Sequence, residues 1–141
     1  MYKLYKNVFL IDDSKMDLAL IRQAFVQNEF IHKVRCFNNS LDFIKYCRGF
    51  KFWRSVPELI LLDWNMPEAS GLEVLKVLRD IKKYKNTPVV VLSSADEKTI
   101  RAESEGYEIS GVIKKPDGYG AWVELINSIE QRWLEEPEDT I

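Results

Sequence analysis

The chain of 141 residues is poor in several residue types, and each shortage argues against a class of site. With one histidine, His32, it offers no firm basis for a Ser/His/Asp or Cys/His catalytic site, and we expect a polar surface role for that residue. Its two cysteines, Cys36 and Cys47, have neither the density of a disulfide scaffold nor the CxxC spacing of a zinc or redox site. We interpret both as reduced core or boundary thiols. The six glycines form neither GxGxxG nor GxxxxGKS after a strand, which argues against a nucleotide cradle and ATP binding.

Long hydrophobic runs and an excess of one charge are also missing. The longest uninterrupted apolar runs, residues 8–11, 59–62 and 89–92, fall far below the roughly 18 residues that spanning a bilayer demands. The first run stops at Asp12, too soon for the core of a signal peptide, so we expect a cytoplasmic protein without a membrane partner. The 20 basic and 22 acidic side chains give a net charge of −2, which disfavours binding to nucleic acid.

Strand and helix patterns alternate along the chain. The three apolar runs have strand length and suit strands buried on both faces, and two weaker strands are expected at residues 33–37 and 110–114. Apolar residues recur at helical spacing in segments between and after the strands. These segments include residues 18–25, 71–81 and 122–133. Five strands and five helices in alternation predict an α/β fold with a doubly wound, five-stranded parallel sheet.

One domain should account for almost the whole chain. Its length is typical of a single domain, and no linker, internal repeat or low-complexity tract divides it. We expect the domain to cover residues 1–136, followed by a short acidic tail at 137–141. A fold of this size leaves no room for a DNA-binding or catalytic effector domain, so a signal would have to leave through protein contacts.

Polar residues follow the expected strands where the active groups of such sheets gather. Asp12 and Asp13 close the first strand, Asp63 the third, Ser93 the fourth and Lys115 the fifth. If the strand order is 2-1-3-4-5, the three carboxylates converge, and their mutual repulsion favours a bound Mg²⁺ with positions left open for a phosphoryl group. The Ser93 hydroxyl and the Lys115 ammonium suit phosphoryl oxygens, and the nucleophile would be Asp63.

These motifs resemble the receiver domain of two-component response regulators. The resemblance rests on the acidic pair, the stretch from Asp63 to Pro67 with Gly71 beyond it, the serine after Val-Val-Val-Leu, and Lys115-Pro116. It implies the flavodoxin-like (CheY-like) strand order 2-1-3-4-5 and an aspartyl phosphate on Asp63, formed from a histidine kinase or phosphotransfer protein. It also implies Mg²⁺ bound directly by Asp13, through water by Asp12, and by the Asn65 backbone carbonyl.

The expected function is that of a stand-alone response regulator that signals by phosphorylation-dependent protein binding. It would be no enzyme beyond its own phosphoryl transfer and dephosphorylation, and its downstream target is not identified by the sequence. The alternative is a phosphorylation-independent pseudo-receiver, which would typically have lost Asp13, Asp63 or Lys115. A haloacid-dehalogenase-like phosphatase would need an aspartate where Asn65 stands. A redox flavodoxin would need a phosphate-binding loop where Asp12 and Asp13 stand.

Three features depart from a compact receiver or bear on its output. Val112 occupies the position at which many receivers carry an inward-turning aromatic residue or threonine. The aromatic segment Gly49 to Pro57 is either a partner-docking loop or a flap over the sheet edge, the latter being favoured. The helix expected from Asp96 to Glu105 has little apolar anchorage beyond Ile100 and Ala102, which permits movement. A homodimer could form through this fourth helix, the fifth strand and the fifth helix.

Overall fold

The computed structural model describes residues 6–29, 33–49 and 56–135 as a parallel five-stranded sheet flanked by helices. Its strand order is β2-β1-β3-β4-β5, as expected for a doubly wound, flavodoxin-like fold. The strands are β1 (Asn7–Ile11), β2 (Lys33–Phe37), β3 (Leu59–Leu62), β4 (Val89–Ser93) and β5 (Gly111–Lys114). Each expected strand is therefore present, with ends that differ by a single residue or not at all.

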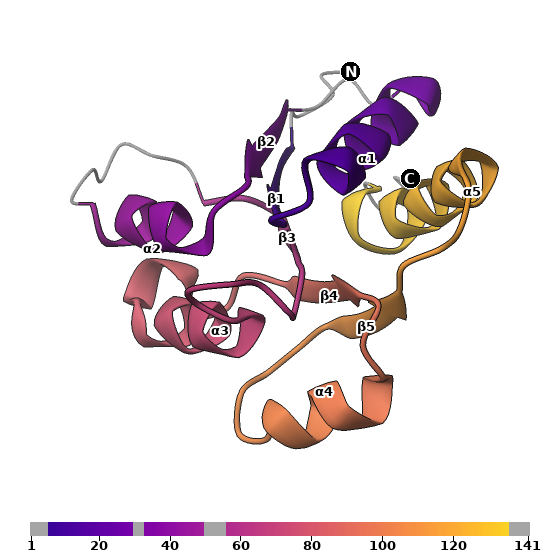
Figure 1. The fold of residues 1–141 in the computed structure, drawn as a ribbon. Helices are drawn as coiled ribbons and strands as arrows, with labels where there is room; N and C mark the ends of the chain where they lie inside the picture. Colours follow the sequence, from indigo (N-terminus) through magenta and orange to yellow (C-terminus); the bar gives the residue numbers. More distant parts are fainter. Residues whose placement is uncertain (1–5, 30–32, 50–55, 136–141) are drawn as a thin grey trace, which may run out of the picture.

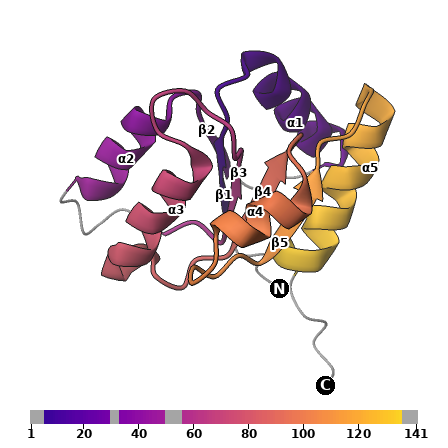
Figure 2. The same cartoon turned by 60° about the horizontal axis from the view of Figure 1, so that its bottom comes forward.

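Helices cover both faces of the sheet. Figures 1 and 2 show α1 and α5 side by side on one face, with α2 and α3 on the other and α4 beside β5. The helices are α1 (Lys15–Gln27), α2 (Ser40–Arg48), α3 (Gly71–Asp80), α4 (Glu97–Glu103) and α5 (Tyr119–Ile129). A short 3₁₀ helix, Lys82–Tyr84, follows α3, and a π-helical turn, Glu130–Leu134, extends α5. Among the described helices, none is long and apolar enough to cross a membrane.

Two apolar cores lie on opposite faces of the sheet because successive strand residues point to opposite sides. In β1, Phe9 and Ile11 pack into the core beneath α2 and α3, whereas Val8 and Leu10 pack into the core beneath α1 and α5. All four residues of β3 are buried. The continuous apolar runs in the sequence are therefore the central strands, each of which is covered on both faces.

Three helices begin with the same capping arrangement. In each, a side-chain oxygen at the N-cap accepts a hydrogen bond from the backbone N–H three residues later, and that later residue is acidic. The three pairs are Ser14 with Asp17 in α1, Asn39 with Asp42 in α2, and Ser70 with Glu73 in α3. Each cap stabilises its helix, and the acidic residue lies at the positive end of the helix dipole.

α4 is the least anchored of the five α-helices that the structure describes. It has seven residues, its N-cap Asp96 makes no side-chain capping bond, and Ile100 is its only buried residue. The expectation that Ala102 also anchors this helix is wrong, because Ala102 is exposed. Two residues along a helix turn the side chain by about 200°, so Ala102 points away from the core that Ile100 enters.

The cysteines are free thiols, as expected from their number and spacing. Cys47 is buried and Cys36 is half-buried. Burial raises the pKa of the Cys47 thiol to about 12, which keeps it protonated and unreactive at neutral pH. The expectations for His32, for the aromatic part of the segment from Gly49 to Pro57 and for the tail at 137–141 fall outside the described residues.

Candidate metal centre

The acidic residues meet because β1 and β3 are neighbours in the sheet. Ile11 pairs with Leu62 at their ends, and the Asp63 backbone N–H donates to the Ile11 carbonyl at 2.9 Å. Asp12 and Asp63 therefore emerge side by side, at 3% and 7% exposure, and Asp13 follows as an exposed residue. One carboxylate oxygen from each of the three lies within 4.8 Å of the other two. This convergence is what the sequence predicted.

Burial disfavours the charged form of the carboxylates in this cluster. Burial, and then the negative charge of Asp12, raise the pKa of Asp63, while Lys115 and the Trp64 backbone N–H lower it, and together they bring it to about 6. Burial also raises the pKa of Asp12, whereas the hydrogen bond from Lys115 lowers it. Crowded, partly buried carboxylate oxygens are ligands that Mg²⁺ accepts. The three carboxylates therefore fit a divalent metal site.

Lys115 brings the positive charge to this site. Its Nζ lies 2.8 Å from Asp12 Oδ2, 2.7 Å from Asp17 Oδ2 and 3.6 Å from Asp63 Oδ2. Its backbone N–H donates to the Ser93 carbonyl at 3.0 Å, which fixes the chain as it leaves β5. Burial alone would lower the pKa of Lys115, but its hydrogen bonds with Asp12 and Asp17 raise that pKa above its ordinary value. The ammonium therefore stays charged at any physiological pH.

Ser93 and Asn65, the two other residues predicted for this site, lie close to it along the chain or the sheet. Ser93 is the last residue of β4, the strand next to β3, and is 1% exposed. Its Oγ accepts a hydrogen bond from the Ala95 backbone N–H at 3.2 Å, so the hydroxyl proton remains available to donate to another group. Asn65 is exposed in the loop between β3 and α3, two residues after Asp63.

The loop after Asp63 is held by close packing at Gly71. A Cβ at Gly71 would lie 2.6 Å from the Asp63 carbonyl oxygen and 2.7 Å from Trp64 Cα, so no larger residue fits without a backbone shift. The Gly71 N–H also donates to the Trp64 carbonyl at 2.8 Å. The beginning of α3 is therefore packed directly against the backbone that carries Asp63.

Two acidic residues near the site were not singled out from the sequence. Asp17, in the first turn of α1, binds Lys115, and Glu103, at the end of α4, accepts a hydrogen bond from Trp64 Nε1 at 3.1 Å. The one signal for Asp17 was its spacing from Ser14, which suits a helix cap. Nothing local in the sequence marks Glu103, because its partner is 39 residues away along the chain.

Comparisons with known proteins agree with this geometry. The response regulator receiver domain family matches residues 8–127. The polar-differentiation response regulator DivK of Brucella anthropi is 30% identical over 128 residues, covering 87% of this chain and 94% of DivK. Response regulator Rcp1 of Synechocystis is 26% identical over 132 residues, covering 92% of this chain and 90% of Rcp1.

Solved structures add two observations. The phosphorylated cyanobacterial phytochrome response regulator RcpA superposes with a TM-score of 0.83 at 31% identity, covering 93% of this chain and 95% of RcpA. The Mn²⁺-bound form of Rcp1 superposes with a TM-score of 0.80 at 25% identity, covering 96% of this chain and 99% of Rcp1. The matched segment, the strand order and the carboxylate cluster agree, and the chain belongs to the response regulator receiver domain family.

Proposed function

We propose that the chain accepts a phosphoryl group on Asp63 from a histidine kinase or phosphotransfer protein and signals by phosphorylation-dependent protein binding. The observation that carries this proposal is a buried carboxylate at a strand end, with two further carboxylates and a lysine ammonium close to it. That RcpA has been solved in a phosphorylated form supports it. Loss of labelling in Asp63→Asn is the test.

Each residue of the site has a role in this transfer. An oxygen of Asp63 forms a bond to phosphorus as the bond from phosphorus to the donor's nitrogen or oxygen breaks, and the electron pair leaves with the donor. Lys115 places positive charge on one phosphoryl oxygen, and the Ser93 hydroxyl donates to another. Asp12, Asp13, Asp63 and the Asn65 carbonyl would hold Mg²⁺, which would supply the remaining charge neutralisation.

A side chain next to the acceptor links the site to the most weakly anchored helix. The backbone N–H of Trp64 donates to Asp63 Oδ1 at 2.9 Å, and the indole N–H of Trp64 donates to Glu103 at the end of α4. Ser93 ends β4, and the loop that follows it leads into the beginning of α4. A phosphoryl group on Asp63 that interacts with Trp64 and Ser93 would therefore shift α4 at both of its ends.

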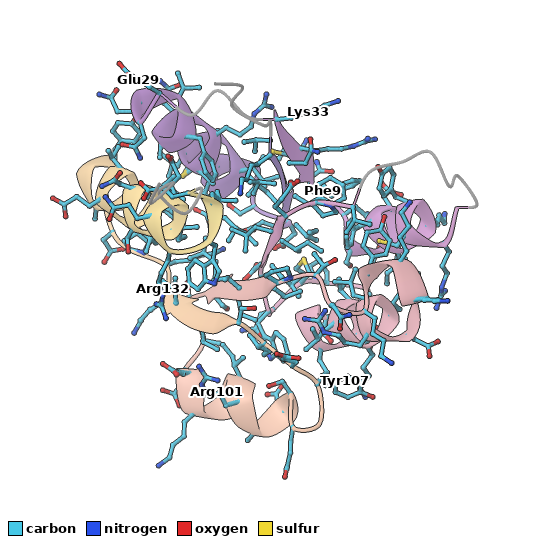
Figure 3. All side chains as sticks on the ribbon, turned by 180° about the vertical axis from the view of Figure 1, so that it is seen from behind. Phe9, Glu29, Lys33, Arg101, Tyr107 and Arg132 are labelled. Atoms are coloured by element: carbon cyan, nitrogen blue, oxygen red, sulfur yellow. The ribbon has the colours of Figure 1, made fainter. Side chains whose placement is uncertain are left out.

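We infer that the output face consists of α4, β5 and α5 and works without an aromatic switch. Val112, in the middle of β5, pairs with Val91 and is half-buried against the core that holds Ile100. A β-branched residue is stiff at χ1, so Val112 gains little by rotating. In Figure 3, the labels of Arg101 on α4 and of Arg132 just beyond α5 help to locate this face.

Charge reversal on α4 should change phosphorylation-dependent association, whereas Val112→Ala should leave it nearly intact. Lys98→Glu and Arg101→Glu alter exposed residues of α4, and we expect each to change the phosphorylation-induced association constant by about 5- to 150-fold, the range of common coupling free energies. Sedimentation with and without acetyl phosphate measures self-association, the simplest form of this output.

The matched control is Lys45→Glu on α2, an exposed charge reversal on another part of the molecule, which should change nothing. The route through α4 would be wrong if Val112→Ala abolished the response while Lys98→Glu and Arg101→Glu behaved like Lys45→Glu.

A further inference from the structure

The Lys115 ammonium has two close carboxylate partners, and neither is Asp63. It lies 2.7 Å from Asp17 and 2.8 Å from Asp12, both within hydrogen-bond distance, but 3.6 Å from Asp63, beyond it. An ammonium has three N–H donors. Asp12 and Asp17 accept two of them, and the third has no short bond to Asp63.

Asp17 is well placed to hold this position. Its backbone N–H is capped by Ser14 Oγ at 3.2 Å, and the Ser14 backbone N–H donates to Asp12 Oδ1 at 2.9 Å. Asp12, Ser14 and Asp17 are thus joined in one network at the start of α1, and the next residue, Leu18, is buried in the core. The side chains of Lys115 and Asp17 are 11% and 25% exposed, so water screens their attraction only in part.

We propose that Asp17 is a positioning residue for phosphoryl transfer, which holds the Lys115 ammonium back from Asp63. This inference rests on the proposed function of Asp63. The separation leaves the Asp63 oxygen free of a direct bond to the ammonium, which would occupy the lone pair needed for attack. It also keeps the third N–H of Lys115 available for a phosphoryl oxygen that arrives between the two groups.

Removing the charge of Asp17 should let the ammonium close on Asp63. Asp12 alone would then hold Lys115, and Asp12 is also needed by the metal. Asp63 is the nearest remaining carboxylate, so the ammonium would bind the nucleophile itself. Asp17→Asn keeps the size of the side chain and an acceptor oxygen, so this change removes charge and little else.

A double-mutant cycle separates this role from a merely structural one. Phosphorylation by acetyl phosphate with saturating Mg²⁺ is followed by intact mass in the wild type, Asp17→Asn, Lys115→Gln and the double variant. Asp17→Asn should slow the rate at least about fivefold, and should cause no further loss in the Lys115→Gln background, as expected for residues that act as a pair. Asp42→Asn is the matched control, because Asp42 has the same place in the capping arrangement of α2 but is exposed.

Each other outcome overturns the inference. A rate for Asp17→Asn equal to that of Asp42→Asn, or faster than the wild type, would show that Asp17 does not hold Lys115 in a productive place. The same loss in both Lys115 backgrounds would show that Asp17 acts through the helix or the general field. A wild type that stays unlabelled would overturn the proposed function together with this inference, whereas the first two results leave the proposed function standing.

Discussion

Asp63→Asn should accept no phosphoryl group from acetyl phosphate in the presence of Mg²⁺, under conditions in which the wild type gains one. The amide oxygen of asparagine carries no full negative charge and is a poor nucleophile, although the side chain keeps its shape and place. Intact-mass analysis over a time course measures the difference. Asp80→Asn, a change at an exposed residue of α3, is the control and should label like the wild type. Equal labelling of Asp63→Asn and the wild type would remove Asp63 from its assigned role.

The same variant has an expected effect on stability, which shows whether loss of labelling reflects unfolding. Burial, and then the charge of Asp12, raise the pKa of Asp63 from 3.8 to about 6. The contribution of this group to stability is therefore full below its ordinary pKa and is lost as the pH rises through about 6. Without metal at neutral pH, Asp63→Asn should melt at or above the temperature of the wild type. Near pH 4 and below, where the carboxyl is protonated, the difference should disappear.

Asp13→Asn should weaken Mg²⁺ binding by at least about tenfold, a typical cost of disturbing a metal site. Asp13 is the exposed member of the cluster, so its carboxylate can be replaced without opening a cavity in the core. The metal-free protein should be as stable as the wild type or more so, because one of three mutually repelling charges is removed. Calorimetric titration gives the affinity, and melting with increasing Mg²⁺ gives the linked gain in stability.

The pH dependence of metal binding provides an internal check on the same site. Protons compete with Mg²⁺ for carboxylate oxygens, so the affinity of the wild type should fall as the pH is lowered through about 6, the pKa to which burial and Asp12 raise Asp63. Asp80→Asn should bind Mg²⁺ like the wild type. A marked drop in the metal-free melting temperature of Asp13→Asn, or an unchanged affinity, would contradict the proposed cluster.

The fold and the metal cluster could be predicted because their causes are local in the sequence. Strands covered on both faces need continuous apolar runs, and the residue that ends each run then lies at one edge of the sheet. Asp12 and Asp63 end two such runs, so a sheet order was enough to bring them together. The buried faces of α1 and α3 likewise followed from helical spacing, with Leu18 and Leu75 in the core as expected.

The side-chain contacts around the site could not be predicted, because they depend on the position and rotation of the helices relative to the sheet. Lys115 and Asp17 are 98 residues apart, and they meet only because the start of α1 lies at the end of β5. The bond from Trp64 to Glu103 depends on the position and rotation of α4, a helix with one buried residue. The error about Ala102 has the same origin, since a short helix with few apolar residues does not define its own inner face.

The pseudo-receiver alternative makes the opposite prediction about chemistry with the same fold. It requires an interaction module whose binding is independent of Asp63, so that Asp63→Asn would associate with partners as the wild type does, with or without a phosphodonor. Retention of Asp13, Asp63 and Lys115 in one site, with the ammonium 3.6 Å from the acceptor, favours the phosphorylated mode.

The most direct measurement is the chemical location of the phosphoryl group. The wild-type protein is treated with acetyl phosphate and Mg²⁺, the acyl phosphate is reduced with borohydride, and peptide mass mapping locates the resulting homoserine. Our account predicts reduction at Asp63 alone, with none at Asp12, Asp13 or Asp17. Reduction at one of those three residues in place of Asp63, or no acyl phosphate at all, would contradict it.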